Sequence, residues 1–198
     1  MANQLIRLAD ANDISDILSI YSPYITDTSI TFENTIPSFP VFEQRMLSIM
    51  QDYPVLVFTN DEKVTGFSYA SKLKERAAYQ WCAELSVYLD IDFHNRGIGS
   101  ILYCALIEIL KLQQIKNVYG VVTLPNIASE RLHASLDFHE LCTFQNSGYK
   151  LGKWHDVKWF EKFISPHESP PHSLIPVREI NKHLIEQLLG DLSLISCK

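Results

Sequence analysis

The segment Asp92–Tyr103, DFHNRGIGSILY, decides the fold, because it joins an alternating stretch of sequence to a long apolar one. Ahead of it, Ala83–Asp90 reads AELSVYLD, where apolar and polar residues alternate as in a half-buried strand. Behind it, Ile98–Ile115 has apolar residues on nearly every side of a helix, which predicts a buried helix. Free backbone N–H groups and the helix dipole both point at such a turn. The pattern therefore predicts an anion site at the two glycines.

Length, charge and cysteine content limit the class of protein. A chain of 198 residues is long enough for one domain with a sizeable core. A formal net charge of −6 argues against a nucleic-acid-binding protein, which needs a basic face to neutralise phosphates. The four cysteines have no C-x-x-C pair and no metal-ligand spacing, which favours reduced thiols and no metal. Without a signal peptide or an apolar span, we expect a cytoplasmic protein that does not bind a membrane.

The rest of the chain reads as strands and helices in a mixed order. The early part predicts a strand at 5–9, a helix from Ile14 that ends before Pro23, a helix at 41–53 and a hairpin near 54–73. The later part predicts a strand at 117–125, a helix from Asn126 and two final β-rich runs. This order predicts a mixed α/β fold around one sheet. Residues 1–165 form the expected domain, and 166–198 form a proline-rich linker with a C-terminal helix at 175–195.

The glycine turn has three possible interpretations as an anion site. A dinucleotide site needs a third glycine and an acidic residue about twenty positions further on, and this chain has neither. A nucleotidase-type phosphate loop needs a lysine between Gly99 and Ser100. The third interpretation is the coenzyme A pyrophosphate turn of the GNAT acetyltransferases, Gln/Arg-x-x-Gly-x-Gly/Ala, which HNRGIG resembles except for His94 in the first position. A tight turn that binds nothing stays open on this motif alone.

Other segments resemble, more narrowly, the phosphinothricin N-acetyltransferase family within GNAT. They are YPVLV, LKERAAYQW, AELSVY, GIGSILY, LPNIASERLHASLDF and SGYKLGKWHDV, in the order of that family and spread over roughly residues 5–163. The resemblance implies a mostly antiparallel twisted sheet, split in a V around acetyl-CoA and flanked by helices. It also implies direct acetyl transfer in a ternary complex, and a homodimer.

The resemblance further implies which residues hold acetyl-CoA. Backbone groups of Val87, Tyr88 and Leu89 would pair with the pantetheine arm, and Asn126 would hydrogen-bond it or cap the following helix. The pyrophosphate would be held by backbone amides of the turn, to which Arg96 would add charge unless it is a solvated turn residue. These turn residues are Asn95, Arg96, Gly97, Ile98, Gly99 and Ser100.

Two residues are candidates for proton transfer. Glu84 matches the general base of the family, and a carboxylate in a β-rich run needs either a partner or a task. A structural salt bridge is the alternative. His133 lies where the phosphinothricin family has a histidine, which would protonate the departing thiolate. Its alternative is a histidine packed on the helix surface.

The resemblance places the acceptor site at Phe32, Lys74, Arg76 and Tyr79, which would receive a small amino-acid-like amine. Glu33 departs from the family, which commonly has a basic residue there, so phosphinothricin itself is in doubt against methionine sulfoximine or another analogue. A polyamine or a protein N-terminus is an alternative acceptor. A non-catalytic acyl-CoA sensor and, more distantly, a nicotinamide-dependent oxidoreductase are alternatives of another class.

Overall fold

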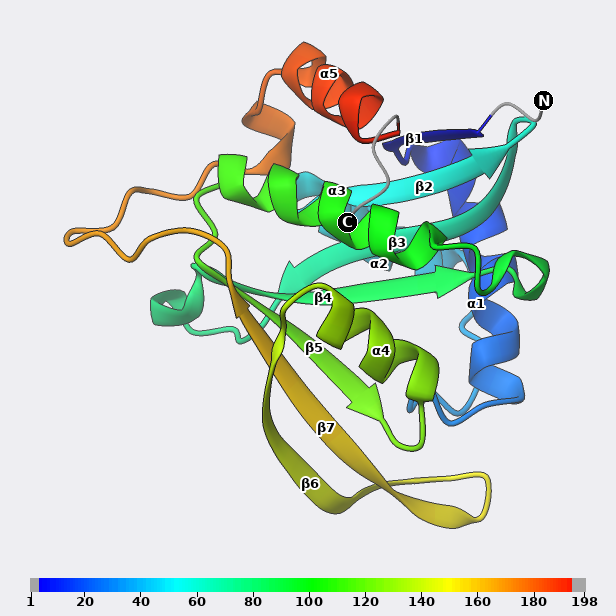
Figure 1. Cartoon of the computed structure of the whole chain (residues 1–198). Helices are drawn as coiled ribbons and strands as arrows, with labels where there is room; N and C mark the ends of the chain where they lie inside the picture. Colours follow the sequence, from blue (N-terminus) through cyan, green and yellow to red (C-terminus); the bar gives the residue numbers. More distant parts are fainter. Residues whose placement is uncertain (1–3, 194–198) are drawn as a thin grey trace.

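The computed structural model describes residues 4–193, whose strands form one seven-stranded sheet (Figure 1). The spatial order is β1-β2-β3-β4-β5-β7-β6, and every neighbouring pair is antiparallel except β4 with β5. This confirms the predicted mixed α/β fold with a mostly antiparallel sheet. The strands are Gln4–Leu8 (β1), Val55–Asn60 (β2), Lys63–Lys72 (β3), Cys82–Leu89 (β4), Asn117–Thr123 (β5), His139–Lys150 (β6) and Lys153–Phe163 (β7).

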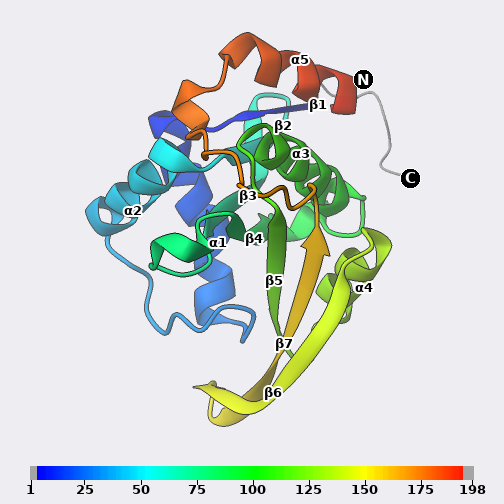
Figure 2. The same cartoon turned by 90° about the vertical axis from the view of Figure 1, so that its left-hand side faces the viewer.

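Helices cover both faces of the sheet (Figures 1 and 2). On one face α1 and α2 pack on β2 and β3, and on the other α3 packs on β2, β3 and β4. The near-continuous apolar run of β2 follows from this arrangement, since alternate side chains enter the two cores on opposite faces. The helices are Ile14–Thr26 (α1), Phe39–Asp52 (α2), Ile98–Leu112 (α3), Ile127–Ser135 (α4) and Lys182–Ser193 (α5).

The sheet splits between β4 and β5. These two strands pair only where Cys82–Glu84 lies beside Asn117–Tyr119. Beyond Glu84, β4 stays paired with β3 as far as Leu89, while β5 stays paired with β7 as far as Thr123. The two strands therefore diverge, as Figure 1 shows, and the predicted V is confirmed.

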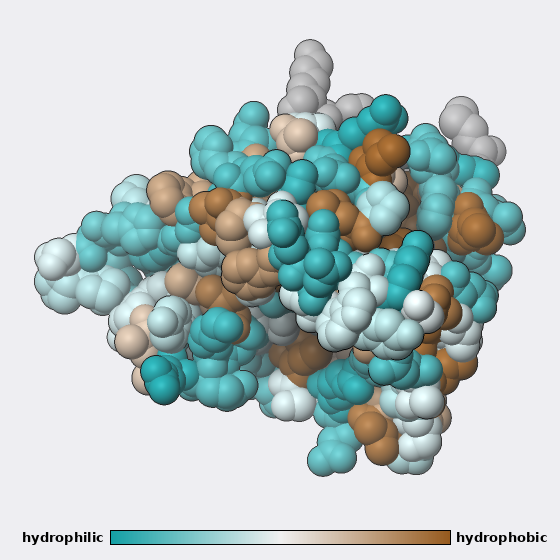
Figure 3. All heavy atoms as spheres, turned by 90° about the horizontal axis from the view of Figure 1, so that it is seen from below, coloured by the Kyte–Doolittle hydropathy of each residue, from teal (hydrophilic) through white to brown (hydrophobic). Residues whose placement is uncertain are grey.

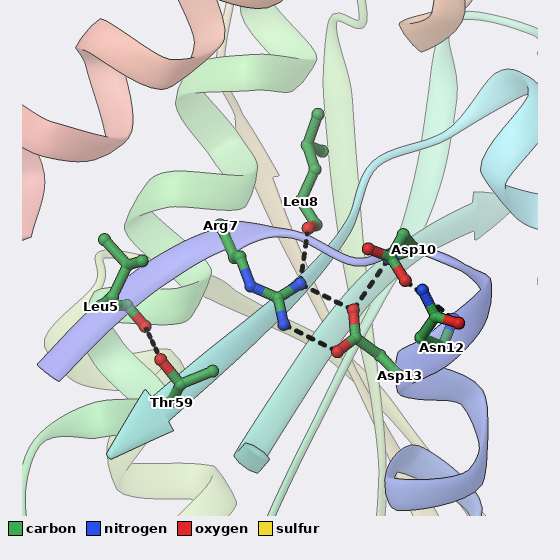
Figure 4. Close-up of polar contacts among 7 residues, drawn as sticks. All are labelled: Leu5, Arg7, Leu8, Asp10, Asn12, Asp13 and Thr59. Atoms are coloured by element: carbon green, nitrogen blue, oxygen red, sulfur yellow. Dashed lines mark hydrogen bonds and ion pairs between the residues drawn. The ribbon is translucent and has the colours of Figure 1, made fainter. Parts of the chain in front are cut away.

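An ion pair joins β1 to the start of α1 (Figure 4). Arg7 donates two hydrogen bonds of 2.7 Å to the Asp13 carboxylate, which also accepts the backbone N–H of Asp10 at 2.8 Å. Asp10 in turn caps the turn by accepting from the backbone N–H of Asn12. The aspartates of the sequence ADANDISD thus fix the angle at which the chain leaves the sheet and enters the helix.

The predicted end of the first helix was wrong, because α1 runs through Pro23 to Thr26. Proline removes the hydrogen bond to the carbonyl four residues earlier, which here belongs to exposed Ser19. Water can satisfy that carbonyl. The last turn closes beyond the proline, where the backbone N–H of Asp27 donates to the Pro23 carbonyl at 2.9 Å.

The C-terminal extension packs on the rest of the chain. After the linker, a short 3-10 helix at Val177–Glu179 leads into α5, and Val177, Ile185 and Leu189 are buried in the core that contains α3. Positions 194–195 of the predicted helix lie outside the described residues. No helix among residues 4–193 is long and apolar enough to cross a membrane.

The cysteines follow the expectation of reduced thiols only in part. Cys82 and Cys142 are free, whereas Cys104 on α3 is disulfide-bonded, so the expectation is wrong for Cys104. Cys197 lies outside the described residues. Spacing along the chain misses such a bond, because a disulfide depends on closeness in space.

Candidate active site

A cavity of about 660 Å³ occupies the V between β4 and β5. One wall is the edge of β4, a second is the glycine turn with the start of α3, and a third is α4 with the end of β5. A cavity of this size fits a small-molecule ligand. Of the predicted cofactor-binding residues, those that line it are Val87, Tyr88, Leu89, Asn95, Gly97, Ile98, Gly99, Ser100 and Asn126.

The direction of the β4 backbone determines what this edge offers a ligand. The N–H of Asp90 donates to the Thr65 carbonyl at 2.9 Å, which makes this pair a hydrogen-bonded one. Hydrogen-bonded and non-bonded pairs alternate in antiparallel strands, so the backbone groups of Tyr88 bond to Phe67 on β3. Those of Val87 turn the other way, into the V. Val87 thus presents an N–H and a C=O to the cavity, whereas Tyr88 does not.

Two tyrosines occupy the backbone groups on either side of Val87. Tyr103 donates its hydroxyl to the Leu85 carbonyl at 3.1 Å. Tyr24 donates to the Leu89 carbonyl at 2.6 Å and accepts from the Leu89 N–H at 3.3 Å, while His94 Nε2 lies 2.8 Å from the same hydroxyl. The sequence did not predict either tyrosine contact. Tyr24 lies 65 positions from Leu89 and Tyr103 lies 18 positions from Leu85, and no local pattern marks contacts over such separations.

The glycine turn has the backbone conformation of an anion site. Gly97 is left-handed with φ of 77° and directly precedes α3, so the free N–H groups of the first helical turn face the cavity. Arg96 turns away from it. Its guanidinium donates to the Asp92 carbonyl at 2.7 Å and lies 4.8 Å from the centre of the Phe93 ring.

Glu84 lies at the point where the V opens, as the last β4 residue paired with β5. The side chain is partly buried, and among residues 4–193 no cation lies within ion-pair distance of it. Burial raises the pKa of Glu84, and the positive charge of Lys74 opposes that rise only in part. A carboxylate without a salt bridge and with a raised pKa has the properties of a general base.

His133 lines the large cavity, but its ring is packed among the aromatic side chains of Phe138 and Phe160. It is 2% exposed, and its Nδ1 donates to the Ser129 carbonyl at 2.8 Å. Its Nε2 has no hydrogen-bond partner within the described part of the chain and lies against Gly120, where an added Cβ would be only 1.9 Å away. Burial lowers the pKa of His133, so the ring is neutral and its one proton is held by a backbone carbonyl. The role of proton donor stays a prediction, and this geometry does not favour it.

Asn126 caps α4, because its Oδ1 accepts from the backbone N–H of Ser129 at 3.1 Å. The side-chain Nδ2 takes no part in that cap and belongs to a residue that lines the cavity. Both interpretations of Asn126 are therefore compatible with one geometry.

The predicted acceptor residues lie in two places, neither on the wall of the large cavity. Phe32 packs against the β6–β7 hairpin, where a Cβ added to Gly148 would be 2.1 Å from its ring. Lys74, Arg76 and Tyr79 are exposed in the loop between β3 and β4. The two basic residues line a separate cavity of about 270 Å³ beside the linker.

The charge of Glu33 is neutralised within the site region. Its carboxylate accepts from Arg45 on α2 at 2.5 Å and from the Tyr21 hydroxyl at 3.2 Å. Next to it, buried Lys150 at the end of β6 donates to the Thr31 carbonyl at 2.7 Å. The loop that carries Phe32 is thereby bound to both α2 and the hairpin.

Comparison with known proteins gives one consistent result. Residues 6–159 match the family profile of the acetyltransferase (GNAT) domain. Phosphinothricin N-acetyltransferase of Streptomyces viridochromogenes is 37% identical over 177 residues, which cover 88% of this chain and 95% of that protein. The L-methionine sulfoximine/L-methionine sulfone acetyltransferase of Salmonella typhimurium is 27% identical over 169 residues, which cover 83% of this chain and 97% of that protein.

Among solved structures, a GNAT superfamily phosphinothricin acetyltransferase from Sinorhizobium meliloti in complex with acetyl-CoA has a similar fold. The TM-score is 0.80 at 26% identity, and the match covers 87% of this chain and 92% of that one. The fold of this chain is thus one for which a complex with acetyl-CoA has been solved.

Proposed function

The chain belongs to the GNAT family of N-acetyltransferases, enzymes that use acetyl-CoA, and we propose that its acceptor is the amino group of a small amino-acid-like molecule. The observation that carries the proposal is the arrangement in the V. There the free backbone edge at Val87 and the left-handed glycine turn lie on the same cavity, with Glu84 where the strands diverge.

The proposed roles follow from the geometry of these groups. Acetyl-CoA supplies an acetyl thioester when bound. The N–H and C=O of Val87 pair with the amide groups of its pantetheine arm, and the amides of Gly97–Ser100 bind the pyrophosphate. Glu84 accepts the proton that an ammonium acceptor must lose before its lone pair can attack. The amine nitrogen then bonds to the acetyl carbon, the C–S bond breaks, and the proton that the nitrogen loses on forming the amide passes to the departing thiolate, so that the coenzyme leaves as a thiol.

The acceptor class rests on the relatives and on Glu33. Proteins with this fold that match most of the chain are named for phosphinothricin and for methionine sulfoximine, both of them amino-acid analogues. Because Glu33 forms an ion pair with Arg45, Glu33 does not present an unpaired negative charge to an anionic acceptor. Lys74 and Arg76 are the proposed partners of an acceptor carboxylate, since both are exposed in the β3–β4 loop and the positive charge of Lys74 acts on Glu84.

Thiol release tests this function. Acetyl-CoA would be mixed with the wild-type protein or Glu84→Gln and with phosphinothricin, methionine sulfoximine, free amino acids or spermidine in turn. We expect thiol release with an amino-acid-like acceptor, and its loss in the variant while acetyl-CoA still binds. Thiol release with spermidine but with no amino-acid-like molecule would show that the acceptor is a polyamine. Binding without turnover for any acceptor would favour a sensor.

We further propose that the outer side of the β6–β7 hairpin forms the homodimer contact. Tyr149 and Trp154, which lie opposite each other in the two strands, are each more than half exposed. Figure 3, which views the molecule from the hairpin end, shows apolar side chains in several patches among hydrophilic ones. Light scattering should give a dimer for the wild type and a monomer for Trp154→Glu. A wild-type monomer would contradict the proposal.

A further inference from the structure

One guanidinium lines the large cavity. Arg131, on α4, is the one Lys or Arg side chain among the described residues that line it, and no Asp or Glu of residues 4–193 does so. The chain as a whole carries a formal net charge of −6. A ligand with several negative charges is repelled by such a chain unless a local cation offsets the repulsion.

The basic residue of the glycine turn does not supply that charge. Arg96 has its guanidinium on the Asp92 carbonyl and over the Phe93 ring, and it is not part of the cavity wall. Backbone amides and the helix dipole give the turn only partial charges. The cavity therefore needs a full positive charge from another element.

Arg131 is placed to give it. The neighbouring Leu132 packs on the glycine turn, with its Cδ2 only 3.8 Å from the position of a Cβ on Gly99. The Arg131 side chain is exposed, and it forms no hydrogen bond or ion pair with another residue in the described range. Arg131 is thus an arginine without a partner among the described residues, on the wall of a cavity that the glycine turn also lines. A guanidinium binds phosphate oxygens in a bidentate way.

We infer that Arg131 binds a phosphate group of the coenzyme, either the pyrophosphate or the 3′-phosphate. The inference rests on the proposed function, because it takes coenzyme A as the ligand of the V. The glycine motif by itself predicts that only the turn binds phosphate, whereas the inference adds a phosphate-binding residue from α4. Arg131 then links the two walls of the cavity through the ligand.

Calorimetric titration with coenzyme A and with 3′-dephospho-coenzyme A tests this without an acceptor. Arg131→Gln should weaken coenzyme A binding by about tenfold or more, since it removes a charge-assisted hydrogen bond to the phosphate. Arg131→Lys keeps the charge but not the planar fork, so its loss should be smaller. Lys182→Gln on α5 removes the same charge from an exposed side chain and should bind like the wild type.

The two ligands distinguish the two phosphates. A 3′-phosphate contact makes the wild type prefer coenzyme A and makes Arg131→Gln indifferent between the ligands. A pyrophosphate contact weakens both ligands equally in that variant. If Arg131→Gln binds coenzyme A as tightly as the wild type does, the inference is wrong but the proposed function stands. If Arg96→Gln loses affinity instead, the phosphate is bound by the arginine of the glycine turn. A wild type that binds neither ligand overturns the proposed function as well.

Discussion

Two carboxylates of this chain, Glu84 and Asp13, have pKa values shifted in opposite directions by their surroundings. Glu84 forms no salt bridge with any residue from 4 to 193, and burial raises its pKa. Burial would also raise the pKa of Asp13, but the hydrogen bonds and charge of Arg7 outweigh that effect and lower it. The pKa of Glu84 is thus shifted in the direction that suits the proposed general base, and that of Asp13 favours the ionised, paired form.

Glu84→Gln should separate activity from stability. Folding raises the pKa of Glu84, so the folded state binds the proton more tightly than the unfolded state does. The stability that this group contributes is greatest at low pH and is lost as the pH rises through the folded pKa. At neutral pH the neutral glutamine should therefore leave the melting temperature unchanged or higher. Thiol release should fall by about 10²- to 10⁴-fold, as expected for loss of a general base.

The pH dependence provides the internal control. In the wild type, kcat/KM should rise with pH through the raised pKa of Glu84, because only the carboxylate accepts a proton. The residual activity of Glu84→Gln should lack that step. A variant that melts well below the wild type, with activity lost in proportion, would make Glu84 a structural residue.

Asp13→Asn should have the opposite profile. The lowered pKa means that Asp13 stabilises the fold above the unfolded pKa, and that this contribution is lost as the pH falls through the folded pKa. We expect the variant to lose about 2 kcal/mol of unfolding free energy at neutral pH, since it weakens a charge-assisted pair with Arg7. Urea unfolding at pH 7 and at pH 3 would measure this. Equal losses at both pH values would contradict it.

At the scale of the element, the alternation in AELSVYLD predicts the strand and its two faces but not which backbone groups remain free. Side-chain direction follows a period of two along one strand. Backbone partners depend on the neighbouring strand and on residues such as Tyr24 and Tyr103, which come from two helices. The sequence therefore predicts β4 as the binding strand, while the particular role of Val87 emerges only from the pairing.

The two glycines of the turn should respond differently to alanine. Gly97 has φ of 77°, so Gly97→Ala should cost about 1 kcal/mol of unfolding free energy, although nothing lies near the added Cβ. Gly99 is helical and its added Cβ would be in ordinary contact with Leu132, so Gly99→Ala should keep the wild-type stability. Because Gly99 lines the cavity, that variant should instead weaken acetyl-CoA binding. Unfolding curves and acetyl-CoA titrations of both variants would measure this. A loss of stability in Gly99→Ala, or unchanged acetyl-CoA binding in that variant, would contradict the prediction.

The β6–β7 hairpin should influence the acceptor and not the coenzyme. Alanine at Gly148 would place a Cβ 2.1 Å from the Phe32 ring, so the loop must move. We expect Gly148→Ala to raise the KM of the amine severalfold with little change in the KM of acetyl-CoA. Gly152→Ala, in the hairpin turn, adds a Cβ with no neighbour within 4 Å but has φ of 78°, so it controls for backbone strain in the hairpin. Equal effects of the two variants would mean that Phe32 does not act on the acceptor.

At the scale of the whole molecule, periodicity predicts most elements, and tertiary contacts determine the rest. The helix through Pro23 persists because the carbonyl left without a donor belongs to an exposed residue, which the pattern of the helix does not reveal. His133 shows the same limit, since the residue type suggests a proton donor while the packing places its ring among aromatic side chains. Similarly, the apolar face of α5 predicts a partner without naming it. The structure supplies β1 and α3.

The extension should be required for the stability of the acetyltransferase fold. Ile185 and Leu189 are 1% and 3% exposed in the core that contains α3, and the linker is held where the Trp81 indole donates to the His172 carbonyl at 2.8 Å. Ile185→Ala and Leu189→Ala should each cost about 3 kcal/mol, as is typical of large-to-small changes in a core. Neither residue lines the large cavity, so the proposed coenzyme site is unchanged in these variants. While they remain folded, acetyl-CoA should therefore raise their melting temperature by as much as it raises that of the wild type. Leu184→Ala, on the exposed side of α5, is the matched control. Near-zero losses in the buried variants would show that α5 is an appendage with no part in the core.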